Sequence, residues 1–173
     1  MANTTFDGPV RSKNGFINLG PGMTKSLTAD TSLTVADHAG RILLLNDADG
    51  KFTLPSINVN ADSAVAGPGS DPNNLNNIGA SFYFYVETLA TDLDIKTDGT
   101  DKFKGAIMIG VDDGSKKAFV PGASNDVITM NGSTKGGIVG SVVSFTAIDT
   151  ATYMVHNSLL IGSGTIVTPF ADA

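Results

Sequence analysis

Few side chains in this sequence could take part in catalysis. The 173 residues include two histidines, His38 and His156, and no cysteine. Histidine can exchange protons near neutral pH, but His38 lies in a turn sequence beside Asp37, and His156 lies within a strand-like segment. We therefore expect structural roles for both, namely a local hydrogen bond for His38 and a satisfied or exposed ring for His156.

The glycine-rich segments do not complete a catalytic or phosphate-binding motif. A nucleophile elbow reads Gly-x-Ser-x-Gly, whereas residues 161–165 read Ile-Gly-Ser-Gly-Thr. The two common glycine patterns of phosphate-binding loops do not occur in the sequence either. We predict that the protein is not an enzyme and that it has no cofactor.

Three acidic segments, 47–50, 98–101 and 112–114, are the candidates for a metal site. Calcium prefers carboxylate ligands, but an EF-hand loop also needs a bidentate glutamate at its last position. None of the three segments has one, because Glu87 is the single glutamate of the chain. Asp-Gly pairs are also typical of β-turns. We interpret the segments as turns and predict no metal site, with calcium binding as the open alternative; paired glycosidase carboxylates are not indicated.

The charge of the chain argues against nucleic acid as a partner. Lys and Arg number 11 against 17 Asp and Glu, so the formal charge is −6. Such a chain repels phosphate backbones, and 116–117 is the one pair of adjacent basic residues. Apolar runs such as 42–45 are far too short to cross a bilayer, and the N-terminal residues show no signal-peptide pattern. We expect no membrane partner and, without cysteine, folding in a reducing cytoplasm.

The composition and the turn spacing predict an all-β fold. Glutamine is absent, and Asp, Asn, Ser, Thr and Gly dominate the polar residues, which favours strands and turns over helices. Nine to eleven short strands are expected, at the spacing typical of a single antiparallel β-sandwich or barrel, jelly-roll-like in form. We expect 41–45 and 51–54 to form a hairpin, and the Asn-Gly pair at 131–132 to form a two-residue hairpin turn.

The alternation in 81–89 gives the clearest strand. Phe82, Phe84 and Val86 should face the core, whereas Tyr83, Tyr85 and Glu87 should lie on the opposite face. Tyrosine offers apolar area with a polar tip. We therefore expect the tyrosine face to be half-buried at a contact between subunits.

Domain organisation follows from the turn-rich segments at each end. Residues 1–26 are interrupted by Gly-Pro and Asn-Gly pairs, with isolated apolar anchors at Phe6, Val10, Phe16 and Ile17. We expect an extended N-terminal arm over 1–26 that lies on its own domain or reaches a neighbour, a frayed terminus being the alternative. The domain itself covers 27–173, with a long loop at 58–79 and an extended tail at 165–173.

Several stretches carry a family resemblance: MANTTFDGPVRS (1–12), LTVADHAGR (33–41) with FTLP (52–55), NDVITMNGSTKGG (125–137), and LLIGSGT (159–165) with TPF (168–170). They resemble virion structural proteins of tailed phages, particularly marine ones, of the capsid decoration or cement type. Tyr153 departs from that pattern, which has a tryptophan there. The resemblance spans most of the chain and is weakest at 58–79.

The resemblance implies a homotrimer that sits where major capsid subunits meet, on the outer surface of the virion capsid, after synthesis in the host cytoplasm. The alternative is a head-fibre or tail adhesin module that binds host-surface glycans. The residues that we expect at the capsid or subunit interface are Phe6, Pro9, Val10, Arg11, Phe16, Ile17, Tyr83, Tyr85, Pro169 and Phe170.

Overall fold

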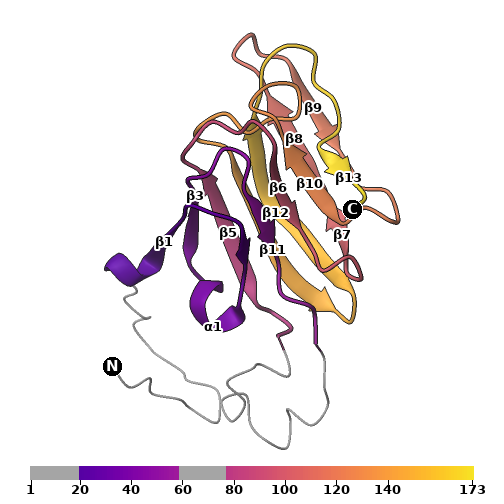
Figure 1. The fold of residues 1–173 in the computed structure, drawn as a ribbon. Helices are drawn as coiled ribbons and strands as arrows, with labels where there is room; N and C mark the ends of the chain where they lie inside the picture. The colour runs from indigo at the N-terminus through magenta and orange to yellow at the C-terminus, as the bar shows by residue number, and fades with distance from the viewer. Residues whose placement is uncertain (1–19, 59–76) are drawn as a thin grey trace, which may run out of the picture.

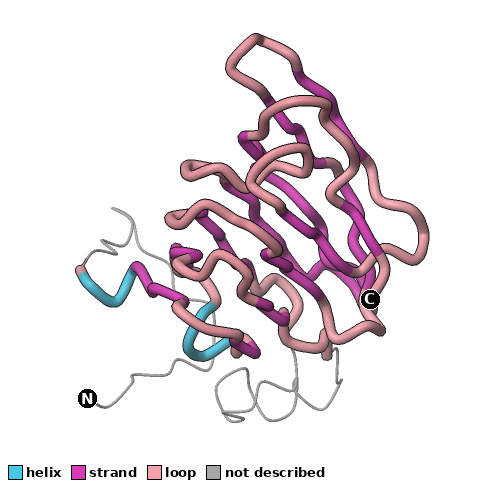
Figure 2. Tube along the Cα trace, turned by 45° about the horizontal axis from the view of Figure 1, so that its top comes forward, coloured by secondary structure: helices cyan, strands magenta, loops and turns pink. Residues whose placement is uncertain are grey.

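Two β-sheets that share one hydrophobic core make up the described part of the chain (Figure 1). The structure is a computed structural model, and it describes residues 20–58 and 77–173. Helical structure in these ranges is confined to a 3-10 turn, Pro21–Met23, and the single helical turn α1, Val35–His38 (Figure 2). The all-β expectation is confirmed.

Within the described residues, the large sheet has eight strands. Seven of them lie side by side in the following order: β1 (Thr24–Leu27), β3 (Ile42–Leu45), β5 (Ser81–Val86), β11 (Val142–Asp149), β12 (Thr152–Ile161), β8 (Ile107–Gly110) and β9 (Lys116–Phe119). The eighth, β7 (Lys102–Gly105), pairs with the first half of β12, and β8 pairs with its second half. β1 begins at Thr24, inside the range expected for the arm.

The small sheet lies against one face of the large sheet and has five strands in the part of the chain that the structure describes. Their order is β13 (Phe170–Ala171), β10 (Val127–Met130), β6 (Leu93–Lys96), β4 (Lys51–Thr53) and β2 (Thr31–Ser32).

The expectation of purely antiparallel pairing is wrong, because both sheets are mixed. From β1 to β6 the chain alternates between the sheets: β1, β3 and β5 belong to the large sheet, and β2, β4 and β6 to the small one. Each in-sheet neighbour is therefore two strands further along the chain and runs in the same direction, which makes these pairs parallel. For the same reason β3 and β4 do not form the expected hairpin.

The expected two-residue turn at Asn131 and Gly132 is also absent. Gly132 has the positive φ that such a turn requires, at 66°. The Asn131 side chain, however, accepts hydrogen bonds from the backbone N–H groups of Ser133 and Lys135, at 3.1 and 2.9 Å. The segment is therefore a longer asparagine-capped loop, and β10 pairs with β6 and β13 instead of with the strand that follows.

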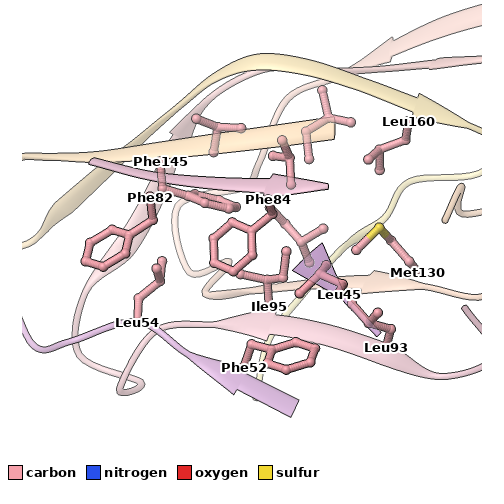
Figure 3. Packing of buried hydrophobic residues seen from close by; sticks show 14 of the residues in the cluster. Leu45, Phe52, Leu54, Phe82, Phe84, Leu93, Ile95, Met130, Phe145 and Leu160 are labelled. Carbon is pink, nitrogen blue, oxygen red and sulfur yellow. The ribbon is translucent and has the colours of Figure 1, made fainter. Parts of the chain in front are cut away.

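The core lies between the two sheets. Phe82, Phe84 and Val86 are buried, as the alternation predicts. In Figure 3 the phenylalanines of the large sheet face Phe52 and Ile95 of the small one. Edge-to-face packing of aromatic rings adds to area burial, and the Phe84 and Phe145 rings meet in this way at 5.7 Å.

Candidate functional site

His38 is a structural residue at the C-terminal end of α1. Its side chain is buried, and Nδ1 accepts a hydrogen bond of 2.9 Å from the backbone N–H of Thr34. Burial, together with Lys25 and Arg41, lowers the pKa of His38, although Asp37 opposes the shift. The ring is therefore neutral near pH 7, and the local hydrogen bond expected from the sequence is confirmed.

His156 lies on β12 in a chain of neutral hydrogen-bonding groups. Its Nε2 is 2.8 Å from the Thr146 hydroxyl, which in turn is 2.7 Å from the Ser81 hydroxyl. Its Nδ1 is 3.1 Å from the side-chain amide of Asn157. A Ser-His-Asp arrangement needs a carboxylate to orient the imidazole, and no carboxylate takes part in this chain. We therefore assign the ring a structural role.

Two of the three acidic segments, 98–101 and 112–114, use a carboxylate as a turn acceptor. Asp98 accepts hydrogen bonds from the backbone N–H groups of Thr100 and Asp101, and Asp113 accepts one from Ser115. Burial opposes ionisation of Asp98, but these bonds and one from Ser56 hold its pKa below the usual value. Within 20–58 and 77–173, no group of three or more His, Cys, Asp or Glu side chains is placed to hold a metal ion.

Pro169 and Phe170, two of the residues expected at an interface, are both buried in the chain's own fold, and Phe170 is 7% exposed. The segment is held by pairing between β13 and β10 and by a 2.8 Å bond from Thr129 N to the Pro169 carbonyl. At the terminus, the Asp126 carboxylate accepts a bond from Ala173 N. The remaining candidates on the arm lie outside the described residues: Phe6, Pro9, Val10, Arg11, Phe16 and Ile17.

Tyr83 and Tyr85 lie on the face of the large sheet that points away from the core, which we call the outer face. Tyr83 is 38% exposed and Tyr85 is half-buried. The strand register places further apolar side chains beside them, in rows that cross the sheet. We define three such rows, because cross-strand neighbours on one face are the side chains that a partner would contact together.

The middle row is apolar across five strands. It consists of Leu44, Tyr85, Val142, Leu159 and Met108, each in register with the next. Val142, Leu159 and Met108 are 36%, 48% and 45% exposed. Large apolar groups are thus at the surface over the centre of the sheet.

The rows on either side are mixed but nearly uncharged. One contains Ile42, Tyr83, Ser144 and His156. The other contains Ser81, Thr146, Met154 and Lys104. Ile42 is 45% exposed and Met154 is 37% exposed. The three rows therefore contain no carboxylate and a single lysine, at their margin.

Charge is segregated from this face. β3, β5, β8 and β12 contain no Asp, Glu, Lys or Arg. By contrast, Lys51 on β4 lies 3.0 Å from both Asp92, just before β6, and Asp94 on β6. Lys102 on β7 lies 2.6 Å from Asp126 beside β10. The three rows of the outer face thus have an apolar centre and no carboxylate, on an otherwise acidic chain.

Sequence reasoning identified the two tyrosines but missed Val142, Leu159 and Met108. A bulge in β12 explains part of the omission. Asn157 has a positive φ of 44°, and the pairing of β11 with β12 shifts register there. The shift turns Leu159 outwards, whereas uninterrupted alternation from Tyr153 would turn it inwards. An asparagine within a strand was the available signal, since asparagine tolerates positive φ better than most residues.

Within the described residues, no helix is both long and apolar enough to span a membrane. A scan against protein-family models and searches of curated proteins and of solved structures found no match to this chain.

Proposed function

We propose that this protein is a non-enzymatic capsid decoration (cement) protein, which binds the outer surface of a phage head and stabilises it through protein–protein contacts. It acts as a homotrimer, with the major capsid protein as its other partner, and it is made in the host cytoplasm. The observation that carries the proposal is the apolar outer face, because exposed apolar patches of this kind mark interaction sites on proteins.

The architecture supports the same role. Two sheets around one core fit the jelly-roll-like β-sandwich that we propose, and such a body is suited to holding contact surfaces in fixed positions. The catalytic candidates, His38 and His156, are both engaged in hydrogen bonds to neutral groups. The capsid as the partner is inferred from the sequence resemblance to phage decoration proteins.

Co-sedimentation with capsids tests the proposal. Undecorated heads of the source phage are mixed with the full chain or with a variant that lacks residues 2–16, and the pellet is assayed for each. We expect the full chain to pellet with the heads and the truncated chain to stay in solution. The truncated chain should remain folded, because the large sheet begins only at Thr24. Failure of the full chain to bind would contradict the function, and unchanged binding by the truncated chain would refute the role of the arm.

A glycan-binding adhesin is the second candidate, and the partly exposed Tyr83 is the observation that favours it. Aromatic rings at a surface can stack against sugars, but Tyr153 is buried and so cannot contribute to such a platform. A reproducible hit on a glycan array, lost in Tyr83→Ala, would support the adhesin. An array without a hit, together with capsid binding, would support decoration.

A further inference from the structure

The outer face of the large sheet has the composition of a protein–protein interface, and we infer that a second copy of this chain covers it. Cores of interfaces are depleted in charged residues and enriched in tyrosine and methionine. The middle row matches this description with Tyr85, Met108, Val142 and Leu159. The inference rests on the proposed function and assigns this surface to the contact between copies, which leaves the capsid contact to another part of the chain.

The exposed apolar side chains indicate that this face is normally covered, because contiguous apolar patches on a protein surface mark interaction sites. The inner face is buried against the small sheet, whereas Ile42 on β3 and Tyr83 on β5 are left 45% and 38% exposed on the outer face.

The charge distribution indicates that the cover is another copy. Two copies of a chain with a formal charge of −6 repel each other. They can meet closely only through a surface without carboxylates, because like charges brought together at an interface are costly. The three rows provide such a surface. A basic partner would instead need acidic residues on this face. The acidic residues that form the described ion pairs, such as Asp94 and Asp126, lie on or beside strands of the small sheet.

The three rows form the centre of a contact. Strands lie about 4.8 Å apart, and alternate residues on one face are about 6.8 Å apart, so a row of five positions and two rows of four cover about 420 Å². Two copies would together bury about 850 Å² through the rows alone, so the contact must extend to neighbouring side chains to reach the about 1,000 Å² that a specific interface should clear.

Light scattering of the purified protein, without capsids, tests the contact. The wild-type mass should be a multiple of the 17.8 kDa chain, three copies in the proposed trimer. Val142→Glu should reduce the mass to that of one chain, because it places a carboxylate without a partner in an apolar contact. Val120→Glu is the matched control, since Val120 is 73% exposed and lies outside the rows. A monomeric wild type, or an unchanged mass for Val142→Glu, would overturn the inference.

Cysteine labelling provides a measurement that does not depend on a destabilising charge. The chain has no cysteine, so Met108→Cys and Val120→Cys each introduce a unique thiol. In the otherwise unchanged chain, we expect a maleimide to react about tenfold more slowly with the thiol at position 108 than with the thiol at position 120, because access controls thiol reactivity. Equal rates would overturn the inference. Slow labelling at 108 in a monomer, made fast by deletion of residues 2–16, would also overturn it, because the chain's own arm would then be the cover.

The two proposals fail in different ways. If the copies associate through the outer face but the protein does not bind heads, the decoration function is refuted and the contact between copies stands. If a monomer with an accessible position 108 binds heads, the function stands and the contact between copies is refuted.

Discussion

Removal of the Tyr153 hydroxyl should measure how strongly the two sheets are tied together beyond apolar packing. Tyr153 lies on β12 of the large sheet, is fully buried, and donates a hydrogen bond of 2.6 Å to the Pro55 carbonyl just after β4 of the small sheet. Burial, with the nearby carboxylates of Asp101 and Asp98, raises the pKa of Tyr153. The hydroxyl therefore keeps its proton, and remains a donor, across the pH range in which the fold is studied.

Tyr153→Phe isolates this bond, because the ring and its edge-to-face contact with Phe82, at 6.5 Å, are retained. A neutral hydrogen bond contributes about 1 kcal/mol net, and a buried acceptor left without a donor costs about 1–3 kcal/mol. Since Pro55 is only half-buried, we expect a loss of about 1–2 kcal/mol in the free energy of unfolding. For a chain of this size that corresponds to a fall of about 2–8 °C in the melting temperature.

Urea unfolding at pH 7, extrapolated linearly to water, is the assay. Tyr83→Phe is the matched control, because it removes the hydroxyl of a tyrosine that is 38% exposed, and it should change the free energy of unfolding by less than about 0.5 kcal/mol. If Tyr153→Phe loses no more free energy of unfolding than Tyr83→Phe, the hydrogen bond from Tyr153 to Pro55 does not stabilise the packing of the two sheets.

Two further predictions concern the C-terminal region and the bend between β7 and β8. Burial opposes ionisation of Asp126, but its bonds, above all from Lys102, hold the pKa of Asp126 below the usual value. The ionised Asp126 therefore stabilises the fold above the pKa of about 3.9 that it has in the unfolded chain, and this stability is lost as pH falls through its pKa in the folded chain. In Asp126→Asn, the free energy of unfolding measured in urea should therefore fall less steeply below pH 4 than in the wild type. Gly105→Ala should destabilise the fold by more than about 2 kcal/mol, since φ is 119° and the new Cβ would clash with the Val155 carbonyl oxygen. Gly22→Ala, in open space at negative φ, is the control, and equal melting temperatures for the two variants would contradict the geometry.

The positions of the strands could be predicted from the sequence, but their partners could not. The predicted segments 41–45, 51–54 and 81–89 contain β3, β4 and β5. Alternation of apolar and polar residues is a local property and determines which face is buried. It carries no information on which sheet a strand joins. The turn residues at 46–50 favoured a hairpin, but Ala48 and Gly50 instead accept hydrogen bonds from Thr91 and Asp94, which start the next strand of the small sheet.

The candidate surface could likewise be predicted from the sequence only in part. The outward position of Tyr83 and Tyr85 follows from one strand alone. Their apolar neighbours Val142, Leu159 and Met108 come from three other strands, and only the register of the sheet brings them into one row. The burial of Phe170 was missed because a two-residue strand leaves no periodic signal, although its pairing with β10 is well defined.

The edges of the large sheet favour assembly through its outer face. Unpaired strand edges invite pairing with another chain, and proteins block them with lysine, proline or short strands. β9, at one edge, carries Lys116 and Lys117 and is soon followed by Pro121. β1, at the other edge, carries Lys25 and is preceded by Pro21 in a 3-10 turn. Both edges thus have the features that discourage strand addition, whereas the three rows between them contain no carboxylate and one lysine, Lys104, at their margin. A chain that assembles by adding strands would show the reverse distribution.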